Sequence, residues 1–174
     1  RGRNAETGAE YALCPGTVAG TFDPDRHVFV NANTRQTQAA LMDVIRLFRA
    51  KRPKLRVLLT VSPVPLTATA SGQHVLTATH YSKSVLRAVA GMVSDRYGFV
   101  DYFPSYEIIT HPVFRGMFFA PNMRSVVPEG VATVMKHFFA DQIAAFPELR
   151  ELRVTPDATQ SAEMAEEDVR CEEV

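Results

Sequence analysis

The sequence has few cysteines and no excess of charge of either sign. Its 174 residues include two cysteines and no tryptophan, and the acidic and basic side chains are equal in number. Cys14 and Cys171 stand far apart, which argues against a disulfide framework or a paired-cysteine metal site and is typical of a reduced, cytoplasmic protein. Zero net charge also removes the usual electrostatic reason to expect nucleic acid as a partner.

Long apolar runs and common catalytic motifs are missing as well. The longest apolar stretch, around residues 55–65, is interrupted by Thr60, Ser62 and prolines, and falls short of the ~18 residues of a membrane span. No GxSxG, HExxH, GxxxxGK[ST] or GxGxxG occurs, so the nucleophile-elbow, zincin and phosphate-loop classes are excluded. We therefore expect no membrane partner, no metal and no cofactor.

The composition that remains is that of one globular domain with a distinct tail. Hydrophobic residues make up 46% of the chain and charged residues 22%, enough for a single sizeable core. Residues 151–174 carry eight acidic and two basic side chains and almost no large apolar ones. We predict a domain over residues 1–150 and a disordered acidic tail over 151–174.

Two predicted amphipathic helices flank a predicted apolar strand. Leu41, Val44, Ile45 and Phe48 follow helical spacing within residues 34–49, and Thr34 is placed to cap the helix. Residues 55–62 form a continuous run of Leu and β-branched side chains, which favours a central parallel strand covered on both faces. We expect flanking helices near residues 34–50 and 84–97.

The rest of the chain repeats this alternation. Residues 5–33 and 63–80 are rich in turn-forming residues and indicate mostly loop, with a short strand at 28–30. Residues 99–103 predict a second strand, followed by a long irregular segment and a third helix over 128–146. The order of helices and strands predicts an α/β protein with a parallel sheet.

Ligands of such sheets bind at the carboxyl ends of the strands, so the loops after Ser62 and Phe103 are the candidate site. Pro63 and Pro65 fix the backbone of the first loop, and Ser105 lies in the second. A rigid strand exit without a ligand is the alternative interpretation.

The histidines differ in their placement. His74 and His80 follow the apolar strand in the expected loop, which makes them the better candidates for a general base. For His27 and His137 a structural role is favoured, and His111 lies in a loop. Ser82 and Lys83 resemble a Ser–Lys pair, but at a helix entry a serine is more simply a cap.

Four blocks of the sequence closely resemble the GSCFA domain, a branch of the SGNH hydrolase superfamily. They are residues 59–69 (LTVSPVPLTAT), 74–76 (HVL), 81–87 (YSKSVLR) and 102–109 (YFPSYEII), preceded by similar stretches at 13–17 (LCPGT) and 29–31 (FVN). The resemblance implies a flavodoxin-like, three-layer parallel sheet. It also implies an ancestral hydrolysis or acyl transfer acting on an acylated saccharide or another small ester.

The chain departs from the SGNH pattern in two places. The family's nucleophilic serine would lie upstream of Arg1, so we expect the first strand to be missing and another polypeptide or an upstream segment to complete the sheet. The family's Asp-x-x-His corresponds here to Asn122 and Ser125, neither of which titrates near neutral pH. Either a nearby imidazole such as His74, His80 or His111 has taken over as base, or hydrolysis has been lost.

From these departures we expect no catalysis by this chain alone. The alternative function is a non-catalytic domain that binds a saccharide or another protein with the same fold.

Overall fold

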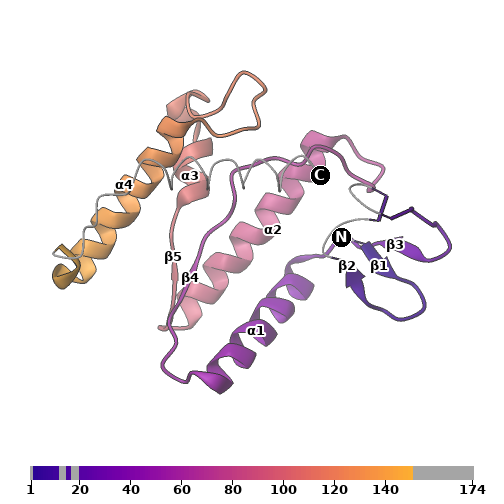
Figure 1. Ribbon diagram of the computed structural model, residues 1–174, viewed down its shortest axis with the longest axis horizontal. Helices are drawn as coiled ribbons and strands as arrows, with labels where there is room; N and C mark the ends of the chain where they lie inside the picture. Colours follow the sequence, from indigo (N-terminus) through magenta and orange to yellow (C-terminus); the bar gives the residue numbers. More distant parts are fainter. Residues whose placement is uncertain (1, 12–14, 17–19, 151–174) are drawn as a thin grey trace. The chain divides into compact units, whose positions relative to one another are not determined.

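The computed structural model describes residues 2–11, 15–16 and 20–150 (Figure 1). The expected tail at 151–174 lies outside these residues, as do Leu13, Cys14 and Thr17 of the family resemblance. The chain divides into two compact units, and each is described by itself below. Of the described residues, the first unit holds those up to Val30 and those at 141–150, and the second holds Asn31–Ala140.

The first unit contains a small antiparallel sheet. Strand β1 (Gly2–Asn4) lies between β2 (Glu10–Tyr11) and β3 (His27–Phe29), with Gly2 opposite both Tyr11 and Phe29. The sequence predicted mostly loop here and only the last of these strands. Strands of two or three residues are too short to produce an alternating pattern, which is why β1 and β2 were missed.

His27 stabilises this sheet. Its ring contacts Tyr11 edge-on at 5.2 Å between centroids, and its Nδ1 accepts a hydrogen bond from the Asp23 N–H at 2.9 Å. This arrangement agrees with the structural role favoured for His27 from the sequence. The first unit also includes a short 3₁₀ helix, η2 (Pro147–Arg150).

The second unit begins with α1 (Thr34–Lys51), close to the expected helix. Its N-cap is Asn33 and not Thr34: the Asn33 side chain accepts from the Gln36 N–H, and the Gln36 side chain accepts from the Asn33 N–H. This reciprocal pair satisfies two backbone donors that have no partner inside the helix.

The core of the second unit forms where both long helices meet a parallel pair of strands. Strand β4 (Val57–Leu59), helix α2 (Val75–Arg96) and strand β5 (Val100–Tyr102) follow α1, and β4 pairs with β5 in parallel register. The expected order of a helix and two parallel strands is thus confirmed. The buried core consists of Met42, Ile45, Val89, Val93 and Val100.

The prediction that the first strand is covered on both faces is wrong for the described residues. Leu58 is 46% exposed, and Asp101, its partner on β5, is exposed as well. An ion pair between Arg56 and Asp101 (2.9 Å) lies on this face. Helices α1 and α2 pack against Val57 and Val100 on the opposite face of the strand pair. The face that carries Leu58 is exposed, and we call it the open Leu58 face.

Helix α2 begins nine residues earlier than expected, at Val75. His74 caps it, since its Nδ1 accepts from the Leu76 N–H at 3.3 Å. His80 therefore lies on this helix and not in a loop.

The segment after β5 contains more regular structure than its prolines indicate. Helix α3 (Ser105–Thr110) and the 3₁₀ helix η1 (Pro112–Phe114) precede a bridge between Phe119 and Val126. Helix α4 (Pro128–Ala145) follows at the expected position. Its Gly130 is buried, and a Cβ there would lie 2.8 Å from Val126 Cγ1 and 3.0 Å from Phe118 Cβ. A residue without a side chain therefore allows α4 to approach so closely.

In the part of the chain that the structure describes, no helix combines the length and the apolar character that crossing a bilayer requires.

Candidate functional site

The carboxyl ends of β4 and β5 are tied together by hydroxyl groups. The Ser105 Oγ donates to the Val61 carbonyl at 3.2 Å and lies 2.5 Å from the Thr60 Oγ1. The Thr60 hydroxyl also lies 2.9 Å from the Phe103 carbonyl, to which it donates. Ser105 is thus brought to the end of both strands, in the place where α/β proteins bind ligands.

The proline-containing loop leaves β4 from the same end. Ser62 is exposed, and its Oγ accepts from the Val64 N–H at 3.2 Å, which forms a local turn. Pro63 and Pro65 are half-buried. The loop is attached to α2 by a hydrogen bond from the Leu66 N–H to the Thr79 Oγ1 (3.1 Å).

The two candidate histidines are both exposed, and they lie on different parts of α2. His74 uses its Nδ1 as the helix cap, while His80 lies in the second turn of the helix. Among the described residues, no serine hydroxyl forms a hydrogen bond with either imidazole.

Asn122 and Ser125 are brought together in one tight turn before α4. The Asn122 Oδ1 accepts from the N–H groups of Arg124 and Ser125, each at 2.9 Å, and the Asn122 Nδ2 donates to the Ser125 Oγ at 2.9 Å. The Ala120 N–H donates to the Ser125 carbonyl (2.8 Å) and closes the turn. The Asn122 side chain thus holds the backbone of this loop, which we call the Asn122 turn, and the Ser125 hydroxyl bonds to that side chain.

A polar cluster that sequence reasoning missed lies beside the end of β5. Glu107 of α3 accepts from the Arg87 Nε at 2.5 Å and from the Tyr102 hydroxyl at 2.8 Å. The Arg87 guanidinium also lies over the Tyr102 ring, 4.1 Å from its centroid. The only available signal was the charge of Glu107 within an otherwise apolar block, because partners 20 residues apart leave no periodic pattern.

Burial of Tyr102, together with its hydrogen bond to the Glu107 carboxylate, raises the pKa of this phenol well above its usual range. The pKa of Arg87 is raised by the hydrogen bond to Glu107, so the guanidinium stays charged. The cluster therefore consists of a cation, a carboxylate and a neutral phenol, and it joins α2, β5 and α3.

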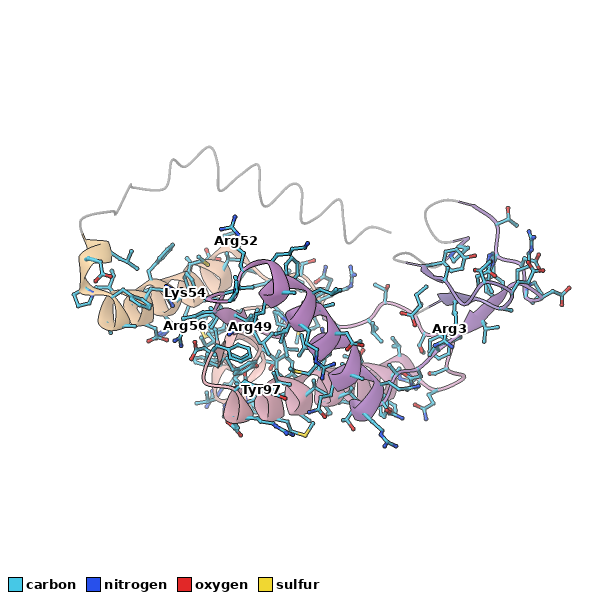
Figure 2. The ribbon with its side chains drawn as sticks, turned by 90° about the horizontal axis from the view of Figure 1, so that it is seen from below. Arg3, Arg49, Arg52, Lys54, Arg56 and Tyr97 are labelled. Carbon is cyan, nitrogen blue, oxygen red and sulfur yellow. The ribbon has the colours of Figure 1, made fainter. Side chains whose placement is uncertain are left out.

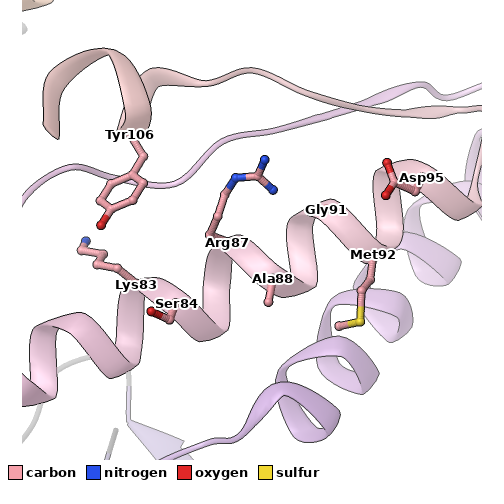
Figure 3. Close-up of a pocket in the computed structure, with 8 residues that line it drawn as sticks. All are labelled: Lys83, Ser84, Arg87, Ala88, Gly91, Met92, Asp95 and Tyr106. Carbon is pink, nitrogen blue, oxygen red and sulfur yellow. The ribbon is translucent and has the colours of Figure 1, made fainter. Parts of the chain in front are cut away.

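An open hollow lies on the same side of α2 (Figure 3). Lys83, Arg87 and Tyr106 are among the residues that line it, and the Lys83 ammonium and the Tyr106 hydroxyl point toward one another. Lys83 is buried to all but 8% of its surface. No contact supports a Ser–Lys pair, since the Ser82 and Ser84 hydroxyls form no hydrogen bond with the residues that the structure describes.

Chemically, these groups lack a charge relay for a serine nucleophile. Within the described ranges, the Ser62 and Ser105 hydroxyls bond to backbone groups or to Thr60, and no imidazole or carboxylate reaches them. The same ranges contain no group of three or more His, Cys, Asp or Glu side chains that would hold a metal ion.

The parallel unit of β4, α2 and β5 defines an α/β protein, and polar side chains at its strand ends form the candidate site. Within this class the chain matches the model of the GSCFA family over residues 3–138, and it belongs to that family. Searches of curated proteins and of solved structures found no match.

Proposed function

We propose that this GSCFA domain has an SGNH hydrolase-like, flavodoxin-like three-layer fold, and that its ancestral chemistry is hydrolysis or acyl transfer on an acylated saccharide. We further propose that the residues of this chain do not perform that reaction by themselves. The family membership and the parallel strand pair support the first part. The second part rests on the Asn122 turn.

The Asn122 turn carries this proposal because the resemblance to SGNH hydrolases matches it to their Asp-x-x-His. A general base must accept a proton near neutral pH, which an amide and an aliphatic hydroxyl do not do. The Asn122 amide instead donates to the Ser125 hydroxyl and accepts from the backbone N–H groups of Arg124 and Ser125. The turn has the chemistry of a structural element and not that of an acid–base pair.

The test is an esterase assay of the full chain with p-nitrophenyl acetate, joined by labelling with a fluorophosphonate probe that reacts with activated serines. We expect no turnover above background and no labelling. We also expect the double variant Asn122→Asp with Ser125→His to remain inactive, because a base and its orienting group need an activated nucleophile.

Three variants identify the residue responsible if activity is found. Labelling that is lost in Ser62→Ala or Ser105→Ala would reveal an active nucleophile at a strand end. Hydrolysis that is lost in His74→Ala or His80→Ala would establish a migrated base. Either result contradicts the proposal.

A second candidate function is a non-catalytic role in which the sheet pairs with another polypeptide. The open Leu58 face and the absence of any further strand beside β4 or β5 in the described residues favour it. Parallel sheets are normally buried on both faces, so a two-stranded parallel pair with an exposed leucine is a suitable place for an added strand or covering segment.

A further inference from the structure

Helix α1 has a second apolar face in addition to the one that packs in the core. Val44, Leu47 and Phe48 are 48%, 71% and 61% exposed. Their spacing of three and four residues places them side by side along the helix. The buried Met42 and Ile45 lie on a different side, toward α2 and the strands. Three large apolar side chains therefore form a stripe that faces solvent.

Three basic side chains that form no ion pair with the described residues lie at the carboxyl end of this stripe. Lys51 follows Leu47 and Phe48 by four and three residues and continues the stripe. Arg52 and Lys54 follow the helix (Figure 2). All three are exposed, and none forms an ion pair with the residues that the structure describes. A shallow hollow between them is lined by Pro53 and Leu55 as well.

The neighbouring arginines are already engaged. Arg49 donates to the Leu55 carbonyl and stacks on Phe99, 3.7 Å from the ring centroid. Arg56 pairs with Asp101 on the strands. The one acidic side chain of α1, Asp43, pairs with Arg46 at 2.7 Å. At this end of α1, the cations without an ion pair among the described residues are Lys51, Arg52 and Lys54.

We propose that Val44, Leu47, Phe48, Lys51, Arg52 and Lys54 form a docking surface, the α1 surface, for an amphipathic helix of another protein that carries carboxylates beside its apolar stripe. A helix laid along α1 covers the three apolar side chains, and its acidic end meets the cations. A membrane-surface helix needs cations along both flanks of its apolar face, whereas these cations lie at one end. This inference does not depend on the proposed function.

The test uses the full chain and two synthetic helical peptides of about 15 residues, a length at which designed helices begin to form in water. Both peptides carry the same leucine stripe, flanked by glutamate in one and by lysine in the other. Binding is measured by fluorescence anisotropy at low and at high salt. Anionic phospholipid vesicles serve as a third probe, and sedimentation of the chain alone reports self-association.

We expect the glutamate peptide to bind about tenfold more tightly than the lysine peptide, and the difference to shrink as salt rises. Leu47→Gln, and the double variant Lys51→Glu with Lys54→Glu, should each weaken binding of the glutamate peptide by about tenfold. Leu66→Gln and Lys136→Glu change exposed residues elsewhere and are the matched controls, which should bind as the unchanged chain does. Circular dichroism verifies that every variant is folded.

Several results would overturn the proposal. Equal affinity for the two peptides, no binding of either, or binding that the α1 variants leave unchanged would each remove the acidic helix as the occupant. Self-association that Leu47→Gln abolishes would identify a second copy of the chain instead. Binding to anionic vesicles but to neither peptide would identify a membrane surface.

Discussion

Glu107 connects three elements through two other side chains. It accepts hydrogen bonds from Arg87 of α2 and from Tyr102 of β5, and it lies on α3 itself. Because α3 begins at Ser105, these bonds hold the segment that carries Ser105 against the strand ends. The cluster thus positions the candidate site, although it contributes no group to a serine relay.

The raised pKa of Tyr102 gives the cluster a measurable dependence on pH. A tyrosine whose pKa is higher in the folded chain than the unfolded value of about 10 stabilises the fold below that pH, and this stability is lost as the pH rises above it. We expect the free energy of unfolding to fall by about 1 kcal/mol between about pH 10 and pH 11 because of this group. Denaturant unfolding at both pH values measures the loss.

One variant isolates the contribution of Tyr102. Tyr102→Phe should have a flatter dependence over this range than the unchanged chain. An identical slope in the unchanged chain and in Tyr102→Phe would contradict the assignment.

At the scale of elements, the closest approach is made by the first turn of α4. Replacing Gly130 by Ala places a Cβ against Val126, Phe118 and Ile109, at distances of 2.8 to 3.2 Å. Alanine favours a helix by about 1 kcal/mol over glycine, but forcing a methyl group into a filled space costs about 1–3 kcal/mol. We expect Gly130→Ala to lower the free energy of unfolding, measured by denaturant titration.

The matched control is Gly98→Ala, since a Cβ at Gly98 meets nothing within 4 Å. This variant should change stability by less than about 0.5 kcal/mol. A Gly130→Ala chain as stable as the Gly98→Ala chain would show that α4 shifts without cost.

Some of these elements can be predicted from the pattern of residue types, and others cannot. Helices α1 and α4 were predicted nearly to their ends, because their lengths contain several helical periods and proline and capping residues mark their limits. The start of α2 was missed because its cap is a histidine, which is not among the usual capping residues. Strand β4 was placed correctly, but an apolar run of this kind does not reveal that Leu58 is uncovered.

The candidate site, too, can be predicted from the sequence only in part. The strand ends with Ser62 and Ser105 followed from the order of helices and strands, which fixes where loops gather. The bonds of Asn122 to Ser125 and of Arg87 to Glu107 depend on how the backbone turns and on which elements meet. Neither is encoded in the spacing of residue types.

For the whole molecule, the open side of the β4–β5 pair should govern association. If another polypeptide normally covers it, the isolated chain exposes Leu58 beside strand edges that pair with no other strand of the described ranges. We expect concentration-dependent association in sedimentation experiments and binding of an apolar dye. Leu58→Lys should reduce both, because a charged side chain opposes burial of this face.

The control for this prediction is Leu66→Lys, which changes a leucine that is 41% exposed in the loop after β4. It should leave association and dye binding as they are. A monomeric chain that binds no dye would show that the open face needs no cover.

The apolar stripe of α1 should affect how much of the protein a cell retains. Chaperones and proteases act on chains that expose large apolar side chains, and Leu47 and Phe48 are more than half exposed. A chain made without its partner would be retained or degraded by this machinery, whereas a chain that has met its partner would escape it. The cellular amount of this protein would then follow the supply of the partner more closely than its own rate of synthesis.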